Sequence, residues 1–209
     1  MQRFRILYSK GEELRYTGNL DMHKVWERTF RRADFKLAYS QGFHPQPKIH
    51  QACPLPLGFS SNYELLDFWL ESEEELGCIK EKLNQKIQPG ITILEISIVP
   101  LESKPLQTLV RSSAYSVLVE SDESSSAIAD RVHSLQQQEQ CIRTRRGKEY
   151  DLLPLIESIS VSTSLPVIID MTLAARAGAT GRPEEVLDAL GIDLADTDVV
   201  RTGLIFEDQ

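Results

Sequence analysis

The chain has 209 residues, of which 41% are hydrophobic and 26% charged, and its formal net charge is −8. This composition is typical of a globular protein and excludes a disordered or fibrous chain. No apolar run approaches the roughly 20 residues of a membrane-spanning helix, and no signal peptide follows the N-terminal charges. We therefore expect a cytoplasmic protein without a membrane partner. The cysteines, Cys53, Cys78 and Cys141, are far apart, which predicts free thiols and no cysteine-ligated iron–sulfur cluster.

Charge is distributed unevenly along the chain. Residues 1–60 carry ten Lys/Arg and five Asp/Glu, whereas residues 61–209 carry thirteen and twenty-six. Because attraction to phosphate follows local positive charge, the acidic body argues against broad, non-specific nucleic-acid binding. The basic N-terminal part permits one localised anionic partner. The alternative is an acidic protein whose surface charge is merely uneven.

The first half of the chain predicts the order β-α-β-β-α-β. Strands are indicated by alternating apolar residues and helices by apolar residues at helical spacing. Residues 35–62 are rich in Pro, Gly, Gln and Ser, and we expect them to combine a short strand with a long loop. The other predicted elements are a strand over 3–8, a helix over 20–33 capped by Thr17 or Asn19, a strand over 63–70, a helix over 73–87 and a strand over 91–99.

The second half repeats this order after a Pro-containing linker at residues 100–106. Its predicted elements are a strand over 115–120, a helix over 126–138, one or two strands over 141–162, a strand over 166–175, a helix over 183–190 and a strand over 199–206. The fold class is therefore α+β, with two tandem ferredoxin-like (βαββαβ) modules at residues 1–100 and 107–209. The first module would contain a Pro-rich loop at residues 39–60.

The Pro-rich loop is the first candidate binding segment. Four prolines and two glycines between residues 39 and 58 restrict the backbone, so the loop is organised before any ligand arrives. The candidate substrate-binding residues in it are Tyr39, Gln41, Phe43 and Lys48. A rigid connection with its polar groups in water is the structural alternative.

Two histidines of this loop, His44 and His50, are candidates for catalysis. Histidines that titrate near neutrality could act as base and acid in RNA cleavage. Together with His23 and Cys53 they could also suggest a metal site, but their spacing does not match the usual zinc patterns. We expect no bound metal.

Two groups of cations are candidates for binding phosphate or acidic side chains. Lys24, Arg28, Arg31 and Arg32 lie opposite the apolar face of the helix predicted over 20–33, although Glu27 can pair with Arg31. Arg143, Arg145 and Arg146 precede Gly147 at a predicted loop tip. In both groups a solvated surface without function is the alternative.

Aromatic residues of the strand over 63–70 could form a further surface. Alternation places Tyr63 and Trp69 on the face opposite Leu66 and Phe68, together with Arg5. RNA-recognition modules stack bases on an open sheet face of this kind. The alternative is that this face is buried against the second module.

Three segments of the first half form one distinctive pattern: residues 16–22 (YTGNLDM), 40–48 (SQGFHPQPK) and 54–58 (PLPLG). This pattern resembles that of one bacterial family, the radical SAM-linked proteins of unknown function. Residues 151–156 and 182–187 fit the second half of the family. Asn19 and Gln46 stand where the resemblance leads us to expect histidine. Members occur beside, or fused to, a cobalamin-binding radical SAM enzyme, so the resemblance implies such an enzyme as partner. The two-module architecture also resembles the CRISPR repeat-processing endoribonucleases.

Together these observations predict a non-catalytic recognition or docking module for a radical SAM enzyme, with tRNA or rRNA as the associated substrate and no cofactor of its own. One alternative is an RNA-cleaving or RNA-modifying enzyme that uses His44 or His50. The other is a purely structural partner subunit.

Overall fold

The computed structural model describes residues 1–120, 123–163 and 165–207. The chain divides into two compact units, Met1–Val110 and Arg111–Gln209. Both contain helices and strands, and the predicted α+β class is confirmed. None of the helices within the described residues is long and apolar enough to cross a membrane.

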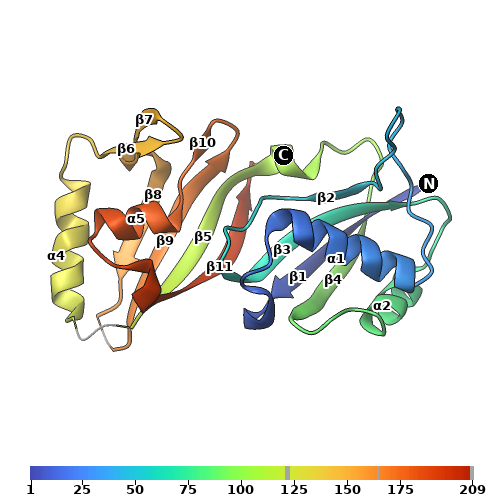
Figure 1. Ribbon diagram of the computed structural model, residues 1–209, viewed down its shortest axis with the longest axis horizontal. Helices are drawn as coiled ribbons and strands as arrows, with labels where there is room; N and C mark the ends of the chain where they lie inside the picture. The colour runs from blue at the N-terminus through green and yellow to red at the C-terminus, as the bar shows by residue number, and fades with distance from the viewer. Residues whose placement is uncertain (121–122, 164, 208–209) are drawn as a thin grey trace. The chain divides into compact units, whose positions relative to one another are not determined.

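The first unit follows the element order β-α-β-β-α-β (Figure 1). Its strands form an antiparallel sheet in the order β2-β3-β1-β4. The elements are β1 (Gln2–Lys10), the short 3-10 helix η1 (Glu12–Leu14), α1 (Asn19–Arg32), β2 (Ile49–Gln51), β3 (Ser60–Leu70), α2 (Leu76–Asn84), β4 (Ile91–Val99) and α3 (Leu106–Leu109).

One face of this sheet packs against α1 and α2. The alternation predicted for β1 and β3 is present, since Phe4, Ile6, Leu66 and Phe68 all have no exposed surface. Aromatic rings continue the core into the helix, and Phe30 of α1 lies with its ring centroid 4.5 Å from that of Phe68. Each such buried side chain contributes about 1.5–3 kcal/mol relative to an exposed one. Burial of this stripe turns the opposite face of α1 toward solvent.

The segment predicted to be a linker covers part of the other face of the sheet, around Arg3. Arg3, which alternation places on this face, is only 2% exposed. Its guanidinium donates hydrogen bonds to the carbonyls of Ser103 and Lys104, at 2.6 and 2.9 Å. Leu106 and Leu109 of α3 are buried as well. Residues 100–109 therefore fold back onto the first unit.

The second unit contains a sheet in the order β10-β9-β5-β11, and β8 also pairs with β9. A separate antiparallel hairpin is formed by β6 and β7. The elements are β5 (Val110–Val119), α4 (Ser125–Gln136), β6 (Ile142–Arg145), β7 (Lys148–Asp151), η2 (Leu153–Leu155), β8 (Ile156–Val161), β9 (Val167–Arg176), β10 (Ala179–Thr180), α5 (Pro183–Ala189), η3 (Leu194–Asp196) and β11 (Thr197–Phe206).

Local sequence signals explain some element boundaries and not others. Pro183 occupies the first turn of α5, as expected for a residue without a backbone N–H. The cap of α1 is Gly18, with no side-chain hydrogen bond, so the prediction of Thr17 or Asn19 is wrong. Gly90 follows α2 with φ 86°, and a Cβ there would lie 2.8 Å from Cγ of Leu14. Both the backbone conformation and the space therefore require glycine at this turn.

Candidate nucleic-acid interface

Residues 38–48 form a narrow arm that projects between α1 and β2 (Figure 1). Two backbone bonds hold its sides together, from N–H of Ser40 to the carbonyl of Gln46 and from N–H of Lys48 to the carbonyl of Ala38, both at 2.8 Å. The Ser40 hydroxyl also accepts a bond from N–H of Gln46 at 3.0 Å. The arm is thus an ordered structure and not a loose connection.

The tip of the arm presents an aromatic ring to solvent. Phe43 is fully exposed, at 102% of its reference surface. It follows Gly42, whose φ of 134° is a conformation that favours glycine. Gln41 and His44 are exposed on either side. Isolated exposed apolar residues are ordinary, but here an ordered arm holds a large ring outside the protein, as binding sites do.

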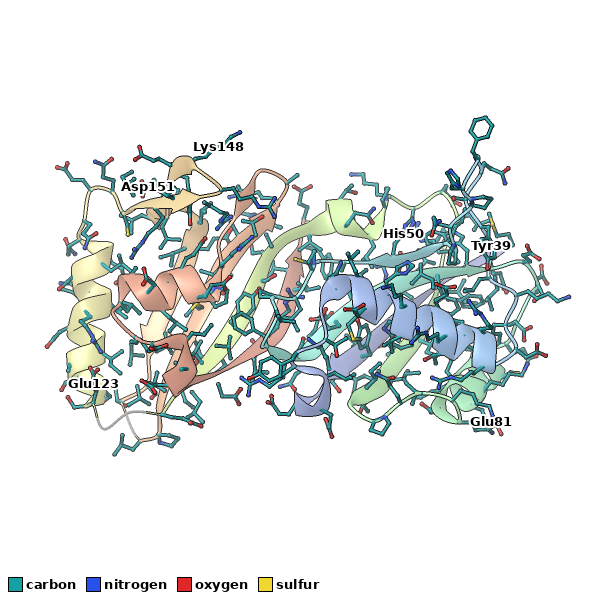
Figure 2. The ribbon with its side chains drawn as sticks, viewed as in Figure 1. Tyr39, His50, Glu81, Glu123, Lys148 and Asp151 are labelled. Atoms are coloured by element: carbon teal, nitrogen blue, oxygen red, sulfur yellow. The ribbon has the colours of Figure 1, made fainter. Side chains whose placement is uncertain are left out.

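At the foot of the arm lies an open hollow of about 250 Å³. Tyr39, which is 47% exposed, forms one side, and the nearly buried Phe35 and Leu37 form its apolar floor. Figure 2 marks Tyr39 at this position. The residues that line the hollow are Glu27, Arg31, Phe35, Lys36, Leu37, Tyr39 and Glu71.

The predicted cationic face of α1 borders this hollow through Arg31. Lys24, Arg28, Arg31 and Arg32 are all exposed. Lys24 pairs with Asp21 at 3.3 Å and Arg31 with Glu27 at 2.6 Å. Exposed pairs of this kind are worth about 0–1 kcal/mol, so a phosphate can compete for the cations. Arg28 forms no ion pair with any residue that the structure describes.

The two candidate catalytic histidines do not meet. His50 lies on β2 (Figure 2) and is half-buried, and its ring centroid is 4.9 Å from that of Trp69. Burial lowers the pKa of His50, and the negative charge of Asp67 opposes this shift. His44 lies at the exposed tip of the arm, on the far side of the bonds that join Ser40 to Gln46 and Lys48 to Ala38. The structure therefore does not assemble them as an acid–base pair.

Trp69 does not offer a stacking surface either. Only 9% of the residue is exposed. The guanidinium of Arg3 lies over its ring at 4.9 Å from the centroid, and the imidazole of His50 contacts its edge. Tyr63 is only partly buried, so the two aromatic residues predicted to share an open face differ in accessibility. Lys48, the last predicted residue of the arm, is half-buried, and its carbonyl accepts a bond from N–H of Trp69 at 3.2 Å.

In the second group of candidate cations, two of the three arginines form ion pairs with residues of α5. Arg145 donates from its Nε and Nη2 to both carboxylate oxygens of Glu185 and from Nη1 to the carbonyl of Thr180. Arg143 pairs with Asp188 at 2.7 Å. Arg146, at the turn with φ 51°, is exposed, as is Lys148 (Figure 2). Of the three arginines predicted to bind substrate, two therefore bind the protein itself.

A buried lysine that the sequence predictions missed connects the segment around residues 15–17 with the segment around residues 58–59. Lys10 is 2% exposed, and its ammonium donates to the carbonyls of Arg15, Thr17 and Phe59 at 3.1–3.3 Å. Arg15 and Gly58 also exchange two bonds, at 2.9 and 3.1 Å. Residues 15–18 and 54–59 thus lie together. Continuing the alternation of β1 by one step, from Tyr8 to residue 10, would have placed this lysine inward.

A small polar cavity of about 10 Å³ adjoins Lys10, large enough for one water molecule. Asn19, Gln51 and Glu64 are among its lining residues. Among the described residues, no three His, Cys, Asp or Glu side chains come together in a metal-binding group.

These features define an α+β protein in which an ordered arm with an exposed aromatic tip lies beside a cationic helix. The chain belongs to the family described as "Uncharacterized protein conserved in bacteria (DUF2344)", whose sequence model matches residues 3–183. Among curated proteins no match is found.

Two solved structures that match the chain are distant from it in sequence. One is a chain of the structure titled "Crystal Structure of a Cbf5-Nop10-Gar1 Complex", with 12% identity and a TM-score of 0.49 over 98% of this chain. The protein spans half of that chain's length. Another is an unknown protein from Galdieria sulphuraria, with 11% identity and a TM-score of 0.30 over 99% of both chains.

Proposed function

We propose that the chain is a non-catalytic recognition module for single-stranded RNA, built from two tandem ferredoxin-like modules, and that it serves a cobalamin-binding radical SAM enzyme. The ferredoxin-like assignment is supported in the first unit by the order β-α-β-β-α-β and the strand order β2-β3-β1-β4. In the second unit, β8-β9-β5-β11 is the corresponding strand order, with the β6–β7 hairpin inserted.

The observation that carries the functional proposal is that Arg31 and Tyr39 line the same hollow. Arg31 belongs to the cationic face of α1, and Tyr39 is the first exposed residue of the arm. Cations and accessible aromatic rings therefore occur together at one place. Proteins that bind single-stranded RNA use this combination, in which cations follow the phosphates and bases stack on rings.

Because the net charge of the protein is −8, RNA binding depends on where on the surface the cations lie. Long-range attraction to RNA is weak for an acidic protein, so affinity must come from close contacts. The arm supplies such contacts at small entropic cost, because its backbone is already ordered. We expect bases to stack on Phe43 and Tyr39 while phosphates bind Arg28, Arg31 and Arg32.

The non-catalytic assignment is supported by the surroundings of the histidines. His50 packs against Trp69 inside the first unit, and His44 lies among the solvent-exposed residues of the arm tip. A general base must itself come within hydrogen-bond reach of the proton that it removes, and the packing of His50 against Trp69 restricts such an approach. The radical SAM partner is supported by the sequence resemblance of residues 16–22, 40–48 and 54–58, and the reaction would take place in that enzyme.

Replacement of the exposed ring tests the proposal. Fluorescence anisotropy with a labelled U-rich single-stranded RNA should show that Phe43→Ala weakens binding by about tenfold, given ~1–3 kcal/mol for one stacked base. Tyr16→Ala, which removes another exposed aromatic side chain outside the arm, should bind as the native protein does. Equal loss in both variants, or no RNA binding at all, would contradict RNA recognition by the arm. Binding of an acidic peptide in place of RNA would assign the same surface to a protein partner.

A further inference from the structure

We propose that the hollow at the foot of the arm is a base-selective subsite that takes guanine. This inference rests on the proposed RNA-binding function and assigns a specificity to it. The hollow measures about 250 Å³, which is below the usual range of pockets for drug-sized ligands and suits one base with part of its ribose. Its floor of Phe35 and Leu37 and its side of Tyr39 provide apolar contact for a planar ring.

Four charged residues line the hollow: Arg31 as a donor and Glu27 and Glu71 as acceptors form the pattern considered for a base, and Lys36 is a second cation. Arg31 donates to Oε1 of Glu27 at 2.6 Å and, being 71% exposed, keeps further N–H groups for a ligand. The same bond orients Glu27, which is only 27% exposed, and leaves its Oε2 as an acceptor toward a ligand. Glu71, held next to Lys36 by a backbone bond of 3.0 Å, supplies a second carboxylate at the hollow.

Guanine is the base whose pairing edge complements this pattern. It presents one acceptor, O6, followed by two adjacent donors, N1–H and N2–H₂. Arg31 would donate to O6, and the carboxylates of Glu27 and Glu71 would accept from the two N–H groups. Adenine and cytosine each present a ring-nitrogen acceptor at the centre of this edge, which would face a carboxylate, and uracil places a second acceptor beside its single donor. The carboxylates therefore favour guanine in two ways: they accept bonds from its N–H groups, and they repel the acceptor atoms of the other bases.

Lys36 completes the subsite on its exposed side. It lines the hollow and forms no ion pair with any residue in the described parts of the chain. An ammonium there can bind the phosphate next to the selected base without reading its identity. Lys36 therefore contributes to affinity and Glu71 to base preference, so that these two contributions can be tested separately.

The experiment compares labelled six-nucleotide RNAs that are all uridine except for one central G, A or C. We expect the native protein to bind the G-containing RNA about tenfold more tightly than the others, the effect of one well-formed set of base contacts. Glu71→Leu should abolish this preference, so that the G-, A- and C-containing RNAs and the all-uridine RNA bind equally well. Glu73→Leu removes the same charge from a residue that does not line the hollow, and should keep the preference.

The outcomes separate this inference from the proposed function. If all four RNAs bind equally well, or if Glu71→Leu keeps the preference for G, the guanine subsite is wrong and RNA binding by the arm stands. If none of the RNAs binds, the proposed function fails and the subsite fails with it. A preference for G that is lost in Glu71→Leu and kept in Glu73→Leu supports the subsite.

Discussion

Arg3 and Asp67 form a buried ion pair at 2.6 Å, with the two side chains 2% and 0% exposed. Arg5 adds a second cation on the same carboxylate, at 2.7 Å. Arg3 also binds the two backbone carbonyls that hold residues 100–109 on the sheet. One carboxylate on β3 therefore connects the strand pair β1–β3 to the covering segment.

We predict that Asp67→Asn destabilises the protein strongly. The change leaves Arg3 buried without a full counter-charge, a situation that costs about 3–5 kcal/mol in buried pairs. Urea unfolding followed by circular dichroism measures this loss. Asp21→Asn, which removes the exposed partner of Lys24, is the matched control and should cost less than about 1 kcal/mol. Similar effects of the two substitutions would show that the buried pair has no special role.

The environment of His50 predicts a pH dependence of stability. Burial lowers the pKa of His50 below its ordinary value of 6.5. Between pH about 6.5 and the lower pKa of the folded state, the unfolded protein binds more protons than the folded protein. The free energy of unfolding therefore decreases as the pH falls through this range. Replacing the side chain by one that does not titrate, His50→Gln, should remove this contribution.

The measurement is the free energy of unfolding at pH 7.5 and pH 5.5 for the native protein, His50→Gln and the control His133→Gln. His133 is exposed on α4. We expect the difference between the two pH values to shrink only in the His50 variant. An unchanged difference in that variant would mean that other groups cause the acid sensitivity.

The ion pairs between the β6–β7 hairpin and α5 predict that Arg145 stabilises the second unit and does not bind substrate. Arg145→Ala removes bonds to Glu185 and Thr180 and the interaction with the ring of Tyr150 at 4.7 Å. Bonds to charged groups contribute about 1.5–3 kcal/mol each when well formed. We expect faster cleavage by trypsin at the basic residues that remain in the hairpin, together with unchanged affinity for RNA. Loss of RNA affinity without faster cleavage would instead assign Arg145 to the interface.

Much of the fold follows from local patterns in the sequence. Strand β4 begins and ends where the β-branched run predicts, and α1 differs from its predicted range by one residue at each end. The ranges of these elements follow from the alternation or helical spacing of apolar residues within each segment. No contact with another segment is needed to predict them. Strand β5 was predicted to begin at Tyr115 but begins at Val110, because its first residues extend the pairing with β9 to Ser112.

The candidate site was only partly predictable, for physical reasons. Composition and spacing indicated the cationic face and the Pro-rich loop, since both are properties of a single segment. The pairing of Arg145 with Glu185 joins residues 40 positions apart, and the burial of Arg3 depends on a segment 100 positions away. Long-range interactions of this kind determine whether a cation is available to a ligand or is paired within the protein. A pattern within one segment does not reveal them.

The salt dependence of RNA binding tests the central claim most directly. The affinity of a U-rich single-stranded RNA is measured across a series of salt concentrations for the native protein and for the triple variant Arg28→Ala, Arg31→Ala and Arg32→Ala. A second triple variant, Lys86→Ala, Lys104→Ala and Arg111→Ala, removes the same charge from exposed cations outside the interface. Removal of one phosphate-binding cation should reduce the slope of log affinity against log salt by about 0.7. We predict a weaker affinity and a smaller slope in the first variant only; equal slopes in all three proteins would contradict RNA recognition by α1 and the arm.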